Sequence, residues 1–149
     1  MIERLLGRLK SHHSIALDTS VFIYHLEGNP RYGALADAVF AWMERPGHEA
    51  VASTVTMTEL LVAPYRNGEQ QKVDAIYALL VTYPHLAWLA PDLEIADLAA
   101  QLRAQHGLKT SGALLAATAL RQGVTLFVTN DWVFRRIGSL ASIVLDELL

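Results

Sequence analysis

The 149-residue sequence contains no cysteine, which excludes disulfide bonds and thiolate zinc sites and agrees with a cytoplasmic location. Its apolar runs all fall well short of the roughly 18 residues that a membrane span needs, and residues 1–13 lack the apolar core of a signal peptide. With 12 basic and 15 acidic residues the net charge is −3, so no overall basic surface indicates nucleic-acid binding. Any contact with RNA or DNA is therefore expected to be local.

The sequence also lacks the loops and pairs that mark two common enzyme classes. Its nine glycines occur singly, so it has neither a phosphate-binding loop nor a dinucleotide fingerprint. Its six histidines include no His-Glu-x-x-His pattern for zinc. These absences leave nucleotide binding and zinc-dependent hydrolysis without support.

Apolar residues make up 52% of the chain and charged residues 18%, a balance typical of a compact globular protein. Short apolar runs alternate with helical patterns, which indicates an α/β fold with a mainly parallel sheet. The predicted strands are Ser14–Asp18, Glu49–Ser53, His85–Leu89, Thr125–Thr129 and Ser142–Leu145. The predicted helices are Tyr32–Glu44, Thr56–Asn67, Glu69–Thr82, Leu93–His106 and Ser111–Gln122.

We therefore expect a single domain over residues 1–149. It should be a three-layer sandwich with about five strands and with helices on both faces of the sheet. Residues 1–13 precede the first strand and are expected to contain a short amphipathic helix. Pro64 lies inside the pattern of the second predicted helix and should kink or shorten it.

Two predicted strands end in a carboxylate. Asp18 ends the first strand, and Asp131 follows the fourth. Ligands of open parallel sheets bind at the carboxyl ends of strands, so both acids face the expected site. The alternative is local: Asp18 caps the next helix, and Asp131 caps a turn or a helix. A phosphotransferase of the haloacid-dehalogenase type would need a second aspartate two positions after the first, and Ser20 stands there.

A third acid, Glu59, lies in the helix that follows the second strand. Taken alone it reads as a first-turn glutamate that the helix dipole favours. Together with Asp18 and Asp131 it forms a set of oxygen donors at α/β junctions, which predicts a site for Mg²⁺ or Mn²⁺. Such a cation lowers the pKa of bound water and neutralises the charge that develops on a phosphodiester.

The order and spacing of five segments resemble the successive motifs of the PIN-domain family, and most resemble the toxin subunits of VapBC-type toxin–antitoxin pairs. These segments are Leu17–Tyr24, Ser53 with Glu59–Leu61, Gly107–Thr110, Ala113–Ala119 and Val128–Asp131. The resemblance implies a Mg²⁺-dependent endoribonuclease that acts on RNA, forms a homodimer and is held inactive by a cognate antitoxin. It implies no membrane partner.

The resemblance also assigns roles to residues. It makes Asp18, Glu59 and Asp131 the metal-ligating, catalytic acids. It implies that Ser20, Thr129 and Asn130 lie beside these acids, either supporting them through polar contacts or contacting the substrate.

Gly112 departs from the pattern, because the family has a further aspartate at this position. Glycine offers no ligand and disfavours the start of a helix by up to about 1 kcal/mol. Three explanations account for Gly112: natural loss of activity, a retained but weaker site, or a substitution selected because the intact toxin harmed its expression host. The alternative function is a catalytically silent module that binds an antitoxin, RNA or its own copy.

Further candidates flank these motifs. Lys109, Arg135 and Arg136 could contact an RNA backbone, although the arginine pair also suits a solvated helix end. Trp132, next to Asp131, stays open as a substrate contact, whereas the other two tryptophans are expected to pack in the interior. Some apolar helix surface is left for a dimer interface or an antitoxin groove.

Overall fold

The computed structural model describes all residues 1–149 and contains one five-stranded sheet in which every pairing is parallel. The strand order is β3-β2-β1-β4-β5. The strands are β1 (Ser14–Leu17), β2 (Glu49–Ser53), β3 (Leu86–Leu89), β4 (Leu126–Thr129) and β5 (Ala141–Val144). All five predicted strands are confirmed to within one residue at each end.

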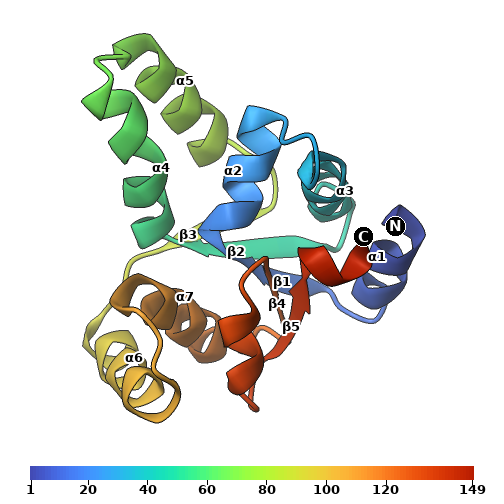
Figure 1. Cartoon of the computed structure of the whole chain (residues 1–149), viewed down its shortest axis with the longest axis vertical. Helices are drawn as coiled ribbons and strands as arrows, with labels where there is room; N and C mark the ends of the chain where they lie inside the picture. Colours follow the sequence, from blue (N-terminus) through green and yellow to red (C-terminus); the bar gives the residue numbers. More distant parts are fainter.

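Helices cover both faces of the sheet, which confirms the predicted three-layer α/β architecture (Figure 1). One face carries α1 (Ile2–Leu9), α2 (Thr19–Glu27), α3 (Gly33–Met43), α4 (Thr54–Arg66) and α5 (Gln70–Val81). The other face carries α6 (Leu93–His106) and α7 (Thr110–Arg121). Two short 3₁₀ helices, η1 (Trp132–Arg136) and η2 (Leu145–Leu148), flank β5. None of the helices has the length and hydropathy that crossing a lipid bilayer requires.

The central strand β1 shows why both faces need helices. Ile15 and Leu17 pack into the core beneath α1–α5, whereas Ala16 between them packs into the core beneath α6 and α7. Successive side chains of a strand point to opposite faces, and a parallel strand is buried on both. The continuous apolar run of the sequence is therefore the signature of a strand between two helical layers.

Local capping sets where two helices begin and end. The Ser53 hydroxyl accepts the N–H of Val55 at 3.2 Å, so α4 begins at Thr54, slightly earlier than predicted. The helix continues past Pro64 to Arg66, so the proline does not end it. Pro64 lies in the last turn, where its missing N–H removes only one intrahelical hydrogen bond. Helix α2 ends at Gly28, whose φ of 60° is left-handed.

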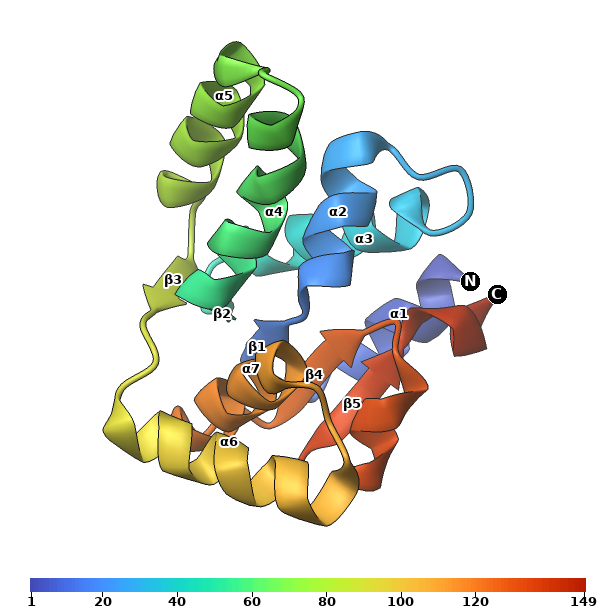
Figure 2. The same ribbon diagram turned by 60° about the vertical axis from the view of Figure 1, so that its left-hand side comes forward.

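The strand order reverses direction beside β1. From β1 the chain proceeds to β2 and β3 on one side of the sheet and returns through β4 and β5 on the other. Loops and helices leave such a reversal point in opposite directions, which opens a crevice at the carboxyl ends of the strands. Figure 2 shows α4 and α5 extending as a hairpin on one side of the sheet, with α6 and α7 on the other. The candidate functional site lies at the reversal between β1 and β4.

Candidate functional site

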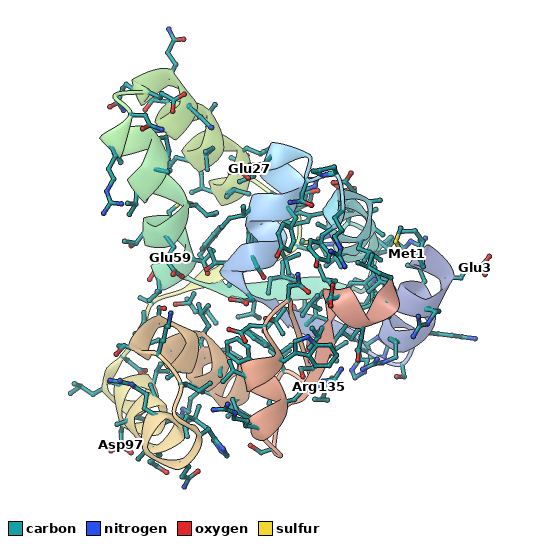
Figure 3. The ribbon with its side chains drawn as sticks, viewed as in Figure 1. Met1, Glu3, Glu27, Glu59, Asp97 and Arg135 are labelled. Atoms are coloured by element: carbon teal, nitrogen blue, oxygen red, sulfur yellow. The ribbon has the colours of Figure 1, made fainter.

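A pocket of about 170 Å³ opens at the carboxyl ends of β1 and β4. It is bounded by the beginnings of α2, α4 and α7 and by η1. All three acids that the sequence singles out line it, and so does Gly112. The polar and glycine positions of its lining are Asp18, Thr19, Glu59, Lys109, Ser111, Gly112 and Asp131. Figure 3 shows Glu59 on the part of α4 nearest to α7.

Asp18 is the most constrained of the acids. Its Oδ1 accepts the backbone N–H of Thr19 at 2.8 Å, so it caps α2, as one of the sequence interpretations expected. Its Oδ2 accepts the hydroxyls of Thr129 at 2.6 Å and Ser20 at 3.3 Å. Burial raises the pKa of the Asp18 carboxyl above its ordinary value, the three hydrogen bonds oppose that rise, and the negative charge of Glu59 adds to it.

Thr129 joins the two strand-end acids. Its hydroxyl donates to Asp18, and the same oxygen accepts the backbone N–H of Asp131 at 3.0 Å. The register of β1 and β4 pairs Leu17 with Val128, so Asp18 and Thr129 are the next residues along each strand. The parallel pairing therefore brings these positions together without any long side chain. Asp131 also caps η1, because its Oδ1 accepts the N–H of Val133 at 3.0 Å.

Glu59 is held by a residue that the sequence analysis did not single out. The Thr19 hydroxyl donates to Glu59 Oε1 at 2.8 Å and lies 2.9 Å from the hydroxyl of Thr56. Thr19 is buried at the first position of α2, beside Asp18. The only sequence signal was its place directly after the strand-end acid, which also suits a helix-capping residue. Thr19 links α2 to α4 and sets the direction of the Glu59 side chain.

Asn130 points away from the acids. Its Nδ2 donates to the Tyr24 hydroxyl at 3.0 Å, and its Oδ1 accepts the N–H of Asp146 at 2.8 Å. The side chain thus connects the end of β4 to α2 and η2, and it does not line the pocket. Of the three polar residues named with the acids, Ser20 and Thr129 contact Asp18 and Asn130 contacts neither Asp18 nor Asp131.

Gly112 lies in the first turn of α7 and faces Phe134. A Cβ added at Gly112 would lie 3.2 Å from the ring carbon Cζ of Phe134, which is buried and packs on Phe127. Any larger residue at 112 therefore requires the Phe134 ring to shift by a few tenths of an ångström. Gly112 and Phe134 both line the pocket, so a side chain at residue 112 would begin at its wall.

The donor chemistry of the pocket suits a hard cation. Its ligands are carboxylate and hydroxyl oxygens, which Mg²⁺ and Mn²⁺ prefer, and Mg²⁺ takes only one or two direct carboxylates and keeps several waters. No group of three or more acids or histidines anywhere in the chain is arranged so that it could hold a metal ion. The pocket therefore fits a weak site completed by water better than a closed site built from protein ligands.

One of the three candidate RNA-binding cations borders the pocket. Lys109 lines it, and Arg136 donates from Nη1 to the carbonyl of His106 at 2.9 Å, close to the loop that leads to Lys109. Arg135 is tied elsewhere, to Ser142 Oγ at 3.1 Å and Glu147 Oε2 at 2.5 Å. Of the three candidate RNA-binding cations, Lys109 lines the pocket, whereas Arg136 contacts the end of α6 and Arg135 has structural partners.

Solved structures of similar fold come from toxin–antitoxin systems. A toxin–antitoxin complex from Klebsiella pneumoniae superposes with a TM-score of 0.65 at 20% identity and covers 88% of this chain and 97% of its own. VapC20 of Mycobacterium tuberculosis, described as a sarcin–ricin loop cleaving toxin, gives 0.68 at 16%, covering 85% and 96%. VapBC-1 of nontypeable Haemophilus influenzae gives 0.66 at 22%, covering 89% and 98%. At these identities the likeness establishes the fold.

The sequence itself establishes the family. No curated protein sequence matches the chain. The sequence model of the PIN domain, however, matches residues 15–140, a span that begins in β1 and ends just before β5. This span includes both strand-end acids, Glu59 and Gly112. With its all-parallel sheet and its acid-lined pocket at the reversal of strand order, the chain belongs to the PIN domain family.

Proposed function

We propose that this PIN domain is a divalent-cation-dependent endoribonuclease of the toxin type whose activity is weakened by Gly112. The observation that carries the proposal is that Asp18, Glu59 and Asp131 line one pocket at the carboxyl ends of β1 and β4. The family match supports the nuclease class, and the fold likeness to VapC20, described as a sarcin–ricin loop cleaving toxin, supports RNA as the substrate.

Asp18 and Asp131, with Glu59 beside them, would hold a Mg²⁺ or Mn²⁺ ion. The ion, when bound, supplies a water of lowered pKa and neutralises charge on the phosphodiester. The protein's own part is to orient the acids. Thr129 and Ser20 fix the Asp18 carboxylate, and Thr19 fixes that of Glu59. These hydrogen bonds keep the carboxylates of Asp18 and Glu59 directed at the same pocket, although their negative charges repel each other.

Lys109 supplies a positive charge at the mouth of the pocket. It can pair with a phosphate of the RNA backbone that approaches the acids, because an ammonium is a compact point charge. Such a contact is needed in a chain whose net charge of −3 repels nucleic acid overall. RNA binding should therefore weaken as the salt concentration rises. The slope should be shallow, because local cations contact only a few phosphates.

Gly112 removes one carboxylate from the lining. A site with fewer carboxylates binds a cation less tightly, and a water molecule would take the coordination position that the missing carboxylate leaves. The helix itself tolerates the glycine, since α7 begins at Thr110 and continues to Arg121. We therefore propose a site of reduced metal affinity, with the fold around it intact.

Cleavage of a structured RNA tests the proposal. The purified chain is incubated with ribosomal RNA in Mn²⁺, in Mg²⁺ and in EDTA, with Asp18→Asn as the matched control. We expect slow cleavage in either metal and none in EDTA or in the variant. Asp146→Asn is a second control, because Asp146 is a surface acid outside the pocket, and it should leave cleavage unchanged. Cleavage that persists in Asp18→Asn would overturn the assignment.

The alternative is a catalytically silent PIN module that binds an antitoxin, RNA or a second copy. Three observations favour it. Asp18 and Asp131 already cap α2 and η1, no group of three acids or histidines is arranged for a metal, and every buried polar side-chain atom has a hydrogen-bond partner. Absence of cleavage both in the chain and in its Gly112→Asp variant would select this alternative.

Protein partners are proposed for the helical hairpin of α4 and α5. A second pocket, about 330 Å³ and largely apolar, lies between α2 and this hairpin, and Glu59 lines it as well as the acid pocket. An antitoxin bound there would adjoin Glu59, and the toxin–antitoxin complexes of similar fold support a protein partner of this kind. Val62 and Tyr65 of α4 and Tyr77 of α5 are exposed, which suits a homodimer.

Sedimentation of the chain alone tests the homodimer. We expect the mass of two copies for the wild-type chain and of one copy for Tyr65→Asp with Tyr77→Asp. If the wild-type chain is a monomer at all concentrations up to about 100 µM, the homodimer proposal is wrong, and the antitoxin is then the proposed partner of this surface.

A further inference from the structure

Trp132 is the one tryptophan that the fold leaves in solvent. Half of its surface is exposed, 51%, whereas Trp42 is buried at 3%. Trp88 is partly buried and donates its indole N–H to the carbonyl of Leu80 at 3.0 Å. A large apolar ring exposed beside a polar pocket contributes little to the core. A single exposed aromatic ring is ordinary in itself, so what distinguishes Trp132 is its surroundings.

The indole ring is supported from one side. The guanidinium carbon of Arg135 lies 5.4 Å from the centroid of the ring, in cation–π contact. Arg135 is in turn held by Glu147 at 2.5 Å and by Ser142 at 3.1 Å. The support is therefore fixed to η2 and β5, and the ring rests on a cation that is itself anchored. The exposed remainder of the ring is available to a ligand.

Trp132 lies within a segment that borders the acid pocket, although its own ring is not part of the lining. Its two neighbours along the chain, Asp131 and Val133, both line that pocket. Lys109 lines the pocket too, and Arg136 is hydrogen bonded to the loop before Lys109. The residues on either side of Trp132 thus line the same pocket as Lys109 and the acids Asp18 and Glu59.

We propose that Trp132 is a stacking platform for one unpaired base of a single-stranded RNA whose backbone enters the acid pocket. This inference rests on the proposed function and adds the form of the substrate. Every base offers a π face, so the platform accepts any base but requires that it be unstacked from a duplex. The cation behind the ring strengthens the contact with the polarisable base and offsets the negative charge of the backbone.

The test separates stacking from cleavage. Binding of a fluorescein-labelled, 2′-O-methylated 12-nucleotide single strand is measured by anisotropy in EDTA, where no metal-dependent cleavage occurs. We expect Trp132→Ala to weaken binding by about tenfold or more and Trp132→Phe to stay within about threefold of wild type, because loss of one stacked base has an effect of this order. The same strand in a duplex should bind no better to wild type than to Trp132→Ala.

Two controls make the result specific. Trp88→Phe changes a tryptophan that lies outside the pocket and should bind as wild type does. Intrinsic fluorescence gives an independent readout, because quenching by the single strand should vanish in Trp132→Phe and persist in Trp88→Phe. Circular dichroism verifies that each variant is folded.

The binding and cleavage results together separate the platform from the nuclease. Equal binding by wild type and Trp132→Ala, or no detectable binding of the single strand by wild type, overturns the platform. Equal binding together with metal-dependent cleavage leaves the nuclease proposal standing without the platform. Loss of binding in Trp132→Ala, in a chain that never cleaves RNA, supports the platform and rejects the nuclease, so the two failures are distinguishable.

Discussion

The hydroxyl of Thr129 donates a 2.6 Å hydrogen bond to the carboxylate of Asp18, across the two strands where the sheet reverses its order. Thr129 is completely buried, so this bond replaces water that the carboxylate would otherwise have on that side. The same oxygen accepts the N–H of Asp131. One small side chain thus sets the position of both strand-end acids.

Replacing Thr129 by valine removes both bonds at nearly constant volume. We expect unfolding in urea to show a loss of about 1–2 kcal/mol, because a buried carboxylate loses a donor. Thr129→Ser keeps the hydroxyl and should lose less than half of that amount. If valine and serine proved equally stable, the hydroxyl would not be the group that matters.

Neutralising Asp18 should stabilise the fold. Burial raises the pKa of Asp18 in the folded state, so the folded protein binds this proton more tightly than the unfolded chain does. The stability of the wild type therefore falls as pH rises from the unfolded pKa to the raised folded pKa, and stays low above it. The Asp18→Asn variant has no carboxyl group to ionise at this position, so it does not lose this stability as pH rises. Its melting temperature should exceed that of wild type at pH 7 and approach it near pH 3; the opposite order at pH 7 would contradict the account.

Glu147 should show the reverse dependence on pH. Burial works against its charge, but hydrogen bonds and ion pairs from Arg135 and Arg8 hold the pKa of Glu147 below its ordinary value. Its contribution to stability is present above the unfolded pKa, about 4.3, and is lost as pH falls through the lowered folded pKa. Because both arginines are partly exposed, Glu147→Gln should cost only about 1 kcal/mol at pH 7 and nothing near pH 2.

Glu3 provides the control for that measurement. It is an exposed glutamate of α1 and forms no ion pair, so Glu3→Gln should leave the urea midpoint unchanged at both pH values. A pH-independent effect of Glu147→Gln would mean that packing, and not charge, accounts for the loss.

Removing the hydroxyl of Thr19 should release Glu59. In Thr19→Val the carboxylate of Glu59 loses its 2.8 Å donor and faces Asp18 without a fixed orientation. We expect metal-dependent cleavage to fall by about tenfold, since partners of ligands contribute on that order, while the fold remains cooperative. Thr58→Val, on the exposed side of the same helix, is the matched control and should retain full cleavage.

Most of the fold follows from sequence patterns because the strands are buried on both faces and read as short apolar runs between breakers. Helix α2 was less visible. Its run Val21–Tyr24 is rich in β-branched and aromatic residues, which favour strands, and it is helical because Asp18 caps its start and Gly28 ends it. Tertiary packing of Val21 and Phe22 then overrides local propensity.

The site was predictable in its positions and not in its side-chain contacts. The carboxyl ends of parallel strands meet at one edge, so the places of Asp18 and Asp131 follow from topology. The direction of a side chain depends on neighbours that are distant in sequence. For this reason Asn130, adjacent to Asp131, turns toward Tyr24, and the Thr19 contact with Glu59 was missed.

Calorimetric titration with Mn²⁺ and Mg²⁺ tests the central claim most directly, that the acids of this pocket hold a cation that Gly112 leaves weakly bound. The titration compares the chain with Gly112→Asp and, because any Cβ at 112 approaches Phe134, with Gly112→Ala. We predict weak binding by the chain and by Gly112→Ala, and binding tighter by about tenfold or more in Gly112→Asp. Absence of binding in all three proteins would contradict the account and leave Asp18, Glu59 and Asp131 as capping and structural residues.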